Sequence, residues 1–497
     1  MHPIDFHVFR TSSGSQYLYD VNTNTVHPLS DGIPEEVIRD IYAAQTADRL
    51  GALSEKYPAH QSFFRYATLW RSHTDAFRNH PPQEKTYLRS IAEAQKNQLI
   101  TSLAWDLILI TTEQCNMRCA YCVHEQDLYP NRRPHGSKSM SLETMRKAID
   151  LYFAMNRSDR VRPFKNRALN IAFYGGEALL NFRAIREAVS YARESYDGPF
   201  ELHLGISTNL TLFDPQWLPF LRDNEVSLSI SLDGPQKEHD RYRRMKNGAP
   251  SFEILEKKLK MIHEFDGEYF KNYLSANITT NGNTQFMDVV RFFEEEHERV
   301  PKIQAISPLK DLETSHFHQM YPYDREAYIE SIRALNHYFT SECLAGRQFV
   351  KGEALYAFTY NFVSDFYNSP HFISRRKNWY TGSCIPGRKI TVTPDEYIHV
   401  CERVGTGRPV GDLDRGIDEE KILAYFNEFL ASTDDCPKCW ARNRCKICPA
   451  EVDSDSGDCY FENRCEQMRN NLNRQFVNVY SLLEQKPDLF AGEYEYF

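Results

Sequence analysis

The sequence predicts an α/β fold: a partial (β/α)6 TIM-like barrel, with a small module before it and a cysteine-rich region after it. Six short apolar runs recur after about residue 104, and amphipathic helical stretches such as 141–155, 182–196 and 251–265 separate them. Alternating strands and helices are typical of parallel βαβ units, and six repeats predict a barrel or partial barrel. The cysteines gather in two places, which in a cytosolic protein indicates metal sites rather than disulfides.

The six predicted strands are short apolar runs of the kind found in buried parallel sheets. They cover residues 107–110, 169–173, 202–207, 226–232, 275–279 and 303–306. After them the chain reads first as helical and aromatic-rich, and then as a stretch punctuated by Cys, Gly and Pro. We therefore expect five segments: an N-terminal module (1–100), the barrel (104–320), a helical bridge (321–380), a cysteine-rich domain (381–470) and a C-terminal helix or tail (471–497).

The N-terminal module carries no catalytic motif. Three extended runs come first, and the second and third form a predicted hairpin around a turn-prone Asn-Thr-Asn stretch. Three helical patterns follow them. The runs cover residues 6–10, 16–21 and 25–29, and the helical patterns cover about 34–49, 59–78 and 84–98. Three strands followed by three helices is the order of a small winged-helix module.

Composition places the chain among ordinary globular proteins, with 41% hydrophobic and 26% charged residues in 497. The net charge of −9 does not suggest a nucleic-acid partner, because phosphate binding requires a basic face. No apolar run is long enough to span a bilayer, and the first residues lack the pattern of a secretory signal. A cytoplasmic protein that binds neither membrane nor nucleic acid is therefore expected.

The first cysteine cluster, Cys115, Cys119 and Cys122, directly follows the first predicted barrel strand with the spacing C-x3-C-x2-C. Active sites of barrel folds gather at this carboxyl edge of the strands. Three thiolates on one loop can hold three irons of a 4Fe–4S cluster and leave the fourth iron open to a small chelating molecule. Two alternatives are open. The three thiols are buried by coincidence, or they form a zinc site. That zinc site would be incomplete, because His124 follows Cys122 too closely to bind the same ion easily.

With Tyr121 before its last cysteine, this loop resembles the cluster motif of the radical S-adenosylmethionine (SAM) superfamily. The resemblance implies that the three cysteines hold a 4Fe–4S cluster, that SAM chelates the open iron, and that Tyr121 packs near the adenine. It also implies that SAM is cleaved reductively to a 5′-deoxyadenosyl radical, which abstracts hydrogen from the substrate. A flavodoxin or ferredoxin is the implied reductant.

Further motifs that match the superfamily follow in the expected order. Gly175, Gly176 and Glu177 come after the second strand, Asn209 ends the third, and Ser231 ends the fourth, with Arg243 beyond it. The resemblance implies that these residues contact SAM. Physically, glycines allow close backbone approach, a carboxylate suits an ammonium group, and an arginine fork suits a carboxylate. The alternative for Gly-Gly-Glu is a tight turn, and the other basic residues at 241–246 read as a solvated helix face.

The second group of cysteines begins with a predicted hairpin flanked by Cys384 and Cys401, and six more cysteines lie at 436–465. A zinc ribbon is the rival interpretation, but only five residues separate the two C-x2-C pairs. The arrangement resembles the SPASM domain, although it has C-x2-C where that pattern has C-x3-C and lacks a cysteine soon after Cys384. The resemblance implies two auxiliary 4Fe–4S clusters, three in all. One would be held by Cys436, Cys439, Cys445 and Cys465, and the other by Cys384, Cys401 and Cys448.

The second auxiliary cluster has three expected protein ligands, so its fourth iron is either open or closed by Cys459 or Cys343. Cys343 lies in a helical pattern, where a core thiol is the plainer interpretation. An open iron would bind a substrate thiolate during C–S bond formation. Glu402 follows Cys401 directly, and relatives place a catalytic base there; a surface carboxylate is the alternative.

The resemblance covers about residues 104–470. The N-terminal module resembles a precursor-peptide recognition element, in which a leader peptide adds a strand to the small sheet, here at the edge formed by 25–29. Together these resemblances imply a maturase of the sactipeptide or ranthipeptide type that installs Cys thioethers in a ribosomal precursor peptide. The alternatives are C–C crosslinking, epimerisation or anaerobic sulfatase maturation, and, outside enzymes, an iron–sulfur or peptide-binding scaffold or a zinc-binding regulator.

Overall fold

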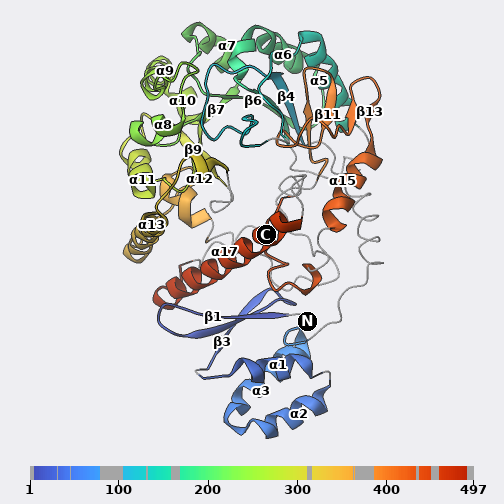
Figure 1. Cartoon of the computed structure of the whole chain (residues 1–497), viewed down its shortest axis with the longest axis vertical. Helices are drawn as coiled ribbons and strands as arrows, with labels where there is room; N and C mark the ends of the chain where they lie inside the picture. Colours follow the sequence, from blue (N-terminus) through green and yellow to red (C-terminus); the bar gives the residue numbers. More distant parts are fainter. Residues whose placement is uncertain are drawn as a thin grey trace.

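The protein is described by a computed structural model, in which the barrel and the N-terminal module lie at opposite ends of an elongated molecule (Figure 1). The structure describes residues 5–78, 105–129, 132–157, 168–309, 316–363, 386–431, 436–448 and 458–489, except positions 31, 45 and 362. The predicted helix at 84–98 therefore lies outside the described residues.

All six predicted barrel strands are present, and they pair in parallel in the order of the sequence, which confirms the α/β fold with a parallel sheet. Each predicted run lies within or nearly coincides with a strand. The strands are β4 (Asp106–Thr112), β5 (Ala168–Gly175), β6 (Glu201–Thr208), β7 (Val226–Ser231), β8 (Leu274–Thr280) and β9 (Lys302–Pro308).

Helices alternate with these strands, as the amphipathic patterns predicted. Side-chain caps mark several of their starts: Ser141 accepts from the Thr144 amide, and Asp324 accepts from the first amides of a long helix that ends at the left-handed Gly346. The helices are α5 (Leu142–Asn156), α6 (Phe182–Ser195), α7 (Leu218–Asp223), α8 (Gln236–Tyr242), α9 (Phe252–Phe265), α10 (Gly267–Tyr273), α11 (Phe286–Glu295), α12 (His316–Met320) and α13 (Arg325–Ala345).

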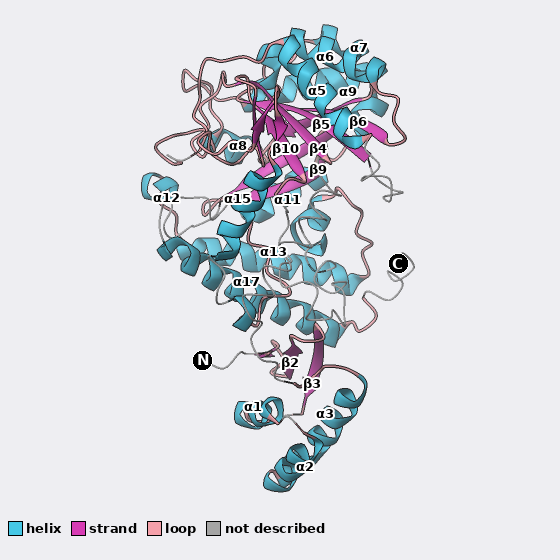
Figure 2. Cartoon of the chain, turned by 90° about the vertical axis from the view of Figure 1, so that its right-hand side faces the viewer, coloured by secondary structure: helices cyan, strands magenta, loops and turns pink. Residues whose placement is uncertain are grey.

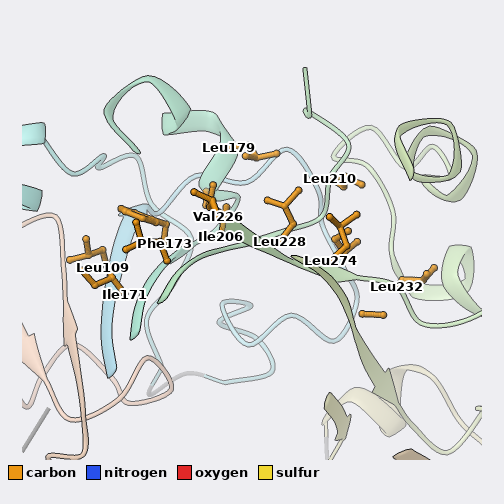
Figure 3. Packing of buried hydrophobic residues seen from close by; sticks show 14 of the residues in the cluster. Leu109, Ile171, Phe173, Leu179, Ile206, Leu210, Val226, Leu228, Leu232 and Leu274 are labelled. Atoms are coloured by element: carbon orange, nitrogen blue, oxygen red, sulfur yellow. The ribbon is translucent and has the colours of Figure 1, made fainter. Parts of the chain in front are cut away.

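The two faces of the parallel sheet differ in character. In β5, β7 and β8 the residues alternate between buried and half-buried, so one face packs under the helices and the other lines the inside of the partial barrel. Leu109, Phe173 and Leu228 belong to the buried face (Figure 3). The inner face carries polar side chains, including Ser229 and Asn277, which hydrogen bond to each other at 2.7 Å. A polar, half-buried inner face suits a polar ligand.

The predicted cysteine hairpin continues the barrel sheet. Its strands are β10 (Lys389–Val392) and β11 (Tyr397–His399), and β10 pairs in parallel with β4, which places the hairpin beside the first cysteine loop. Two short strands, β12 (Gly411–Asp412) and β13 (Gly416–Ile417), extend the sheet to ten strands, and α15 (Glu419–Ala431) follows. Figure 2 shows β10 beside β4.

The N-terminal module contains the three predicted strands, β1 (Phe6–Arg10), β2 (Gln16–Asp20) and β3 (Thr25–Leu29), in an antiparallel sheet with β2 in the middle. The helical pattern predicted at 34–49 is divided into α1 (Glu35–Ala43) and α2 (Ala47–Lys56), because the Thr46 side chain caps a new helix. A 3-10 turn (Pro58–His60) and α3 (Gln61–His73) complete the module.

The N-terminal sheet is covered on both faces. Phe6, Leu18 and Leu29 pack on the module's own helices, whereas Phe9, Tyr19 and Val21 pack on α17 (Asp458–Gln485), which lies against the sheet in Figure 1. The sequence analysis did not predict this second contact. Among the described helices, none combines the length and apolar character needed to cross a membrane.

Candidate functional site

The first cysteine loop lies at the carboxyl end of β4, and the segment after α8 holds it in place through backbone bonds. The amide of Arg118 donates to the carbonyl of Arg244 at 2.8 Å, and that of Ala120 donates to Tyr242 at 2.9 Å. An isolated bridge joins Met117 to Met245. The segment that follows α8 therefore serves as a backbone partner of the cysteine loop, and the side chains of Arg244 and Lys246 are exposed, as predicted. The same prediction is wrong for Arg241, which is half-buried and pairs with the buried Glu238 at 2.6 Å.

The three thiols of this loop are half-buried and interact with one another electrostatically. Burial raises the pKa of Cys115 to about 11 and that of Cys122 to about 12, and it also raises the pKa of Cys119. In the metal-free protein the thiols are therefore neutral. Iron stabilises thiolates and would offset this penalty, so the donor set fits an iron–sulfur cluster.

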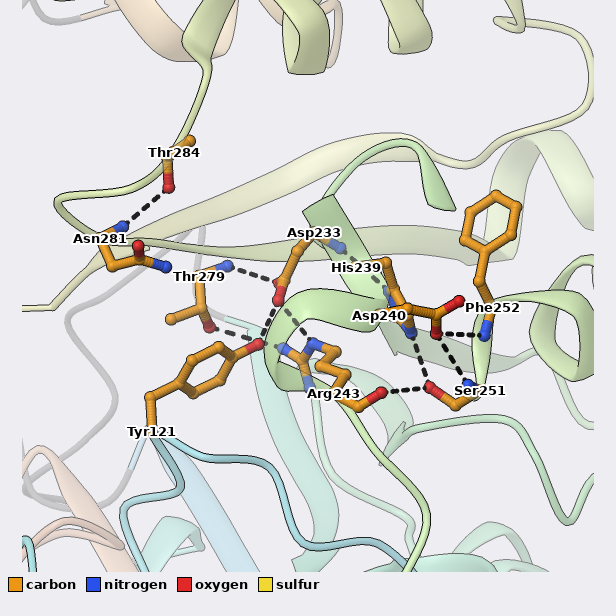
Figure 4. Close-up of polar contacts among 10 residues, drawn as sticks. All are labelled: Tyr121, Asp233, His239, Asp240, Arg243, Ser251, Phe252, Thr279, Asn281 and Thr284. Carbon is orange, nitrogen blue, oxygen red and sulfur yellow. Dashed lines mark hydrogen bonds and ion pairs between the residues drawn. The ribbon is translucent and has the colours of Figure 1, made fainter. Parts of the chain in front are cut away.

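Asp233 connects three parts of the site (Figure 4). Its Oδ2 accepts from Arg243 Nε at 2.9 Å and from the hydroxyl of Tyr121, and its Oδ1 accepts from the Thr279 amide at 2.8 Å. The Arg243 guanidinium also lies over the Tyr121 ring, 5.3 Å from its centroid. Its charge works to lower the pKa of Cys119, against the effect of burial. Asp233 therefore holds both the predicted adenine-side aromatic and the predicted carboxylate-binding arginine next to the cysteine loop.

Glu177 is almost fully buried, and three protein groups donate to its carboxylate. These are the Thr208 hydroxyl at 2.6 Å, the Asn209 amide at 2.7 Å and the Leu179 amide at 3.0 Å. Burial raises its pKa despite these bonds. The described contacts of Glu177 thus tie β5 to the end of β6.

Gly175 and Gly176 permit a close approach between backbones. A Cβ on Gly175 would lie 2.2 Å from the Thr112 carbonyl oxygen, and one on Gly176 would lie 2.2 Å from that of Gln114. Gly175 also has a positive φ of 148°. The pair therefore lets the end of β5 press against the chain that leads into the cysteine loop.

Asn209 reaches the cysteine loop directly, because its amide nitrogen donates to Asn116 Oδ1 at 3.0 Å. Thr211 completes a triangle: its hydroxyl donates to Asn209 Oδ1 at 2.6 Å and accepts from Asn116 at 2.8 Å. Ser231 is half-buried at the end of β7 and pairs in register with Asn277. The structure thus brings all seven predicted SAM contacts to one edge of the sheet.

Two histidines beside the cysteine loop have different environments. His124 turns away, and its Nδ1 donates to the carbonyl of Arg133 at 2.9 Å; burial lowers its pKa to about 4. His135, which sequence reasoning missed, places Nε2 at 3.5 Å from Cys122 Sγ. His135 lies 13 residues after Cys122, so no local sequence pattern indicates that the two side chains meet.

Glu402 lies near the same edge. Its Oε2 accepts from Cys401 Sγ at 3.2 Å, and its side chain is 14% exposed. Burial works to raise the pKa of Glu402, but Lys389, hydrogen bonds and Arg403 outweigh burial and lower the pKa. Burial raises the pKa of Tyr174, at the end of β5, and the nearby groups Glu402, Cys122 and Cys401 raise it further. The two cysteine regions therefore meet around Tyr174.

Arg133 is buried near this junction, within electrostatic reach of Cys401 and Tyr174. It is 2% exposed, and none of its three guanidinium nitrogens has a hydrogen-bond partner in the described part of the chain. A buried guanidinium needs an acceptor. This orphaned donor fits a site beside Cys401 that receives sulfide or another acceptor.

The distal cysteines are brought together in part. Burial raises the pKa of Cys445 to about 11, and Cys439 and Cys465 add to the effect, so these three thiols are neighbours. Cys436 starts the short turn that leads to Cys439. Both Cys448 and Cys401 raise the pKa of Arg403, so both thiols lie within electrostatic reach of that guanidinium.

The remaining cysteines, Cys343, Cys384 and Cys459, lie outside these two groups. Cys343 is buried on α13 in the hydrophobic core, in agreement with a structural thiol. Cys384 and the side chain of Cys459 lie outside the described residues. Within the described ranges, no three His, Cys, Asp or Glu side chains gather around a single point as one metal ion would require. In a 4Fe–4S cluster each thiolate binds a different iron, so its ligands need not converge in that way.

Comparison with known proteins agrees with this geometry. Residues 109–292 match the family model of the Radical SAM superfamily. This range includes the cysteine loop, Gly-Gly-Glu, Asn209, Ser231 and Arg243. The chain therefore contains a radical SAM domain, and SAM with a 4Fe–4S cluster are the cofactors of that superfamily.

Two curated relatives are anaerobic sulfatase-maturating enzymes. The cysteine-type enzyme of Clostridium novyi (strain NT) is 26% identical over 228 residues, which are 46% of this chain and 58% of the relative. The serine-type enzyme of Bacteroides thetaiotaomicron is 28% identical over 184 residues, which are 36% of this chain and 41% of the relative. The match thus spans less than two thirds of either relative.

A solved structure of native anSMEcpe with bound AdoMet and Cp18Cys peptide has a similar fold. It superposes with a TM-score of 0.52 at 16% sequence identity, covering 75% of this chain and 98% of that chain. At this identity the likeness concerns the fold.

Proposed function

We propose that this chain is a radical SAM enzyme that modifies a side chain of a peptide. The observation that carries the proposal is that β10 of the second cysteine region pairs in parallel with β4, which leads into the first cysteine loop. Tyr174 lies within electrostatic reach of Cys122, Cys401 and Glu402. A site for SAM cleavage and a second iron–sulfur site would then flank one substrate position.

In this proposal Cys115, Cys119 and Cys122 hold the SAM-binding cluster. When bound, the cluster and SAM supply a 5′-deoxyadenosyl radical that abstracts hydrogen from the substrate. Asp233 orients Arg243 for the SAM carboxylate and Tyr121 for the adenine. Glu177 and Asn209 hold the strand ends and the cysteine loop in register.

The C-terminal cysteines would hold two auxiliary clusters in a SPASM-type arrangement, three clusters in all. Cys439, Cys445 and Cys465 are neighbours, which supports a shared site that includes Cys436. The orphaned Arg133 supports a second site near Cys401. Glu402 is held ionised beside that site and would take the proton that the substrate releases.

The substrate would be a ribosomal precursor peptide whose leader binds the N-terminal module. The sheet face that carries Phe9, Tyr19 and Val21 is occupied by α17, and among the described strands β3 pairs with β2 alone. The β3 edge therefore supports strand addition by the leader. The product we propose is a Cys thioether, with electrons entering from a flavodoxin or ferredoxin.

Anaerobic sulfatase maturation is the second candidate, because two of the curated relatives carry that name. In that case the substrate is a Cys or Ser of a sulfatase. The radical SAM site would be the same, and only the substrate and the fate of its sulfur would differ.

The test is anaerobic co-expression with the short peptide encoded beside this gene, followed by intact mass and thiol alkylation. Loss of two hydrogens per bond, with one thiol per bond made unreactive, supports thioether formation. Loss of two hydrogens with all thiols reactive indicates C–C crosslinks, and a mass change at a Cys or Ser of a sulfatase peptide, with none in the precursor peptide, indicates the second candidate. Absence of 5′-deoxyadenosine with wild-type enzyme contradicts both.

Glu402→Gln tests the proposed base separately. We expect product formation to fall by about 10²- to 10⁴-fold, because a positioned base contributes about that much. 5′-Deoxyadenosine should still form, and Cys115→Ala is the control that abolishes it. Unchanged product formation in Glu402→Gln would show that this carboxylate has no part in proton transfer.

A further inference from the structure

The loop between Cys439 and Cys445 is a docking surface for the N-terminal sheet. Five residues separate the two cysteines, and each of them contacts β1, the residue directly before β1, β2 or the turn that follows β2. Trp440 stacks on His7, with ring centroids 3.8 Å apart and 7° between the planes. Ala441 is buried among Phe9, Tyr19 and Val21.

The three polar residues of the loop contact this sheet just as closely. Arg442 Nη2 donates to Asp5 Oδ1 at 2.7 Å, and both side chains are almost completely buried. The Asn443 amide donates to the carbonyl of Val21, and Arg444 Nε donates to Asn24 Oδ1 at 3.0 Å. These partners lie directly before β1 and in the turn between β2 and β3.

The helix α17 joins the same assembly. It carries Cys465, which neighbours Cys445, and its Asn473 hydrogen bonds to His7 at 2.8 Å. Phe476 of α17 packs against Phe9 and Tyr19 at centroid distances of 5.0 and 4.8 Å. A metal group on Cys439, Cys445 and Cys465 would thus tie together the two elements that hold the N-terminal sheet.

The conformation of the loop depends on what holds its cysteines. It contains turns but no helix or strand, and its backbone bonds are short-range, such as Arg442 N to Cys439 O at 3.2 Å and Arg444 N to Ala441 O at 2.9 Å. Short cysteine loops of this kind obtain their order from the metal they bind, because binding free energy becomes folding free energy. The burial of the Arg442–Asp5 pair demands an ordered loop, since a misplaced partner leaves a buried charge unpaired.

We propose that iron–sulfur loading at the Cys436, Cys439, Cys445 and Cys465 site controls docking of the N-terminal sheet, and that docking in turn retains the cluster. The inference rests on the auxiliary site of the proposed function. It adds a regulatory step: a chain without this cluster does not present its peptide-recognition module against the barrel-bearing part. Linkage requires that the effect be reciprocal.

The first test compares hydrogen exchange in the anaerobically reconstituted full chain with that of the same chain after iron chelation. We use Cys115→Ala/Cys119→Ala/Cys122→Ala, so that all cluster iron resides on the C-terminal cysteines and no SAM chemistry is needed. Amides of residues 5–24 should exchange at least about tenfold faster after chelation, whereas β7 amides should not change. Equal exchange of residues 5–24 in both states overturns the proposal, and so does a chain that binds no iron.

The reciprocal test measures iron release to a chelator in the same background. Arg442→Met removes the buried pair, and we expect iron release about tenfold to a hundredfold faster. Lys438→Met is the matched control, because Lys438 is exposed in the turn just before Cys439 and its replacement should leave the release rate unchanged. Asp5→Asn is a milder second variant that keeps a hydrogen-bonding side chain and should accelerate release in the same direction.

The outcomes separate this inference from the proposed function. Release at the wild-type rate in both Arg442→Met and Asp5→Asn overturns the coupling, even if the enzyme produces 5′-deoxyadenosine. Faster release in both supports the coupling, even if no peptide product is found. An equal acceleration in Lys438→Met would show a general charge effect and would also overturn it.

Discussion

Asp233 is the residue on which the geometry of the SAM edge depends. The sequence contains it in the run that ends β7, but its role emerges only from the contacts it makes with Arg243, Tyr121 and the Thr279 amide. The Arg243–Asp233 pair is buried, with side-chain exposures of 10% and 5%. A buried, charge-assisted contact of this kind orients groups more than a surface pair does.

Asp233→Asn should therefore slow SAM cleavage without removing the cluster. The amide keeps the size of the carboxylate but loses its charge, so Arg243 and Tyr121 are held less firmly. We expect 5′-deoxyadenosine formation to fall by about tenfold to a hundredfold, the range of a hydrogen bond to a charged group. Iron content should be unchanged. Asp197→Asn, at an exposed site, is the control, and an equal rate for the two variants would count against the role assigned to Asp233.

The ends of β4 and β5 determine, at the scale of elements, how the cysteine loop leaves the sheet. The amide of Gly176 donates to the Thr112 carbonyl at 2.8 Å, and that of Glu177 donates to Gln114 at 2.8 Å. The two glycines permit this approach because any side chain would occupy the space of the facing backbone. The motif thus supports the cysteine loop structurally as well as lying near the expected ligand.

Gly175→Ala should destabilise the barrel by at least about 3 kcal/mol, because it combines a backbone clash with a positive φ. Gly205→Ala is the matched control, since its Cβ would meet its nearest neighbour at an ordinary 3.7 Å. Thermal unfolding and iron content measure the two effects. If Gly175→Ala unfolds at the temperature of Gly205→Ala and holds as much iron, the close approach has no energetic importance.

The N-terminal sheet should lose stability in acid because of His27. Burial lowers its pKa to about 4, and the ring lies between the Thr25 and Tyr66 hydroxyls. The unfolded chain takes up a proton below about pH 6.5, whereas the folded module does so only near pH 4. Stability is therefore complete above pH 6.5 and falls as the pH drops toward 4, by on the order of 3 kcal/mol.

Denaturant unfolding at pH 7 and pH 5, followed by tryptophan fluorescence, measures this loss, because Trp70 packs edge-on against His27 at 4.6 Å. His27→Gln should be less stable at pH 7 but should show a flatter acid limb. The same acid limb in wild type and His27→Gln would assign the pH dependence to other groups.

At the scale of the whole molecule, α17 and the cysteine loop connect the N-terminal sheet to the C-terminal part of the chain. Its two faces are covered by different parts of the chain, one by α1 and α3 and the other by α17. Leu472, Phe476 and Val479 of α17 are buried against it. The N-terminal module and α17 therefore share one buried apolar cluster, although they lie at opposite ends of the sequence.

Removal of residues 1–100 should cause the remaining chain to self-associate. Truncation exposes the apolar face of α17, and each side chain that becomes exposed costs about 1.5–3 kcal/mol. Light scattering on a sizing column should show oligomers, and Phe476→Ser in the truncated chain should shift them toward monomer. A monodisperse truncated chain would mean that this face does not need its partner sheet.

The sequence was sufficient for the features that depend on local pattern. The barrel strands, the N-terminal strands and the hairpin after Cys384 were predicted close to their observed bounds, because alternation and turn chemistry are properties of neighbouring residues. Motif spacing likewise placed Cys115, Gly175, Asn209 and Ser231 at or just after strand ends, which the parallel pairing then brought to one edge.

Tertiary structure alone decided the rest. Asp233 and His135 contact Tyr121 and Cys122 because loops bring them together, and local sequence pattern does not predict the course of those loops. The cysteine hairpin became part of the barrel sheet by pairing with β4. Arg442 meets Asp5 across 437 positions of sequence. A contact at that separation depends on how the completed elements pack, so the sequence could identify the chemistry of the cysteines but not the sheet that their loop supports.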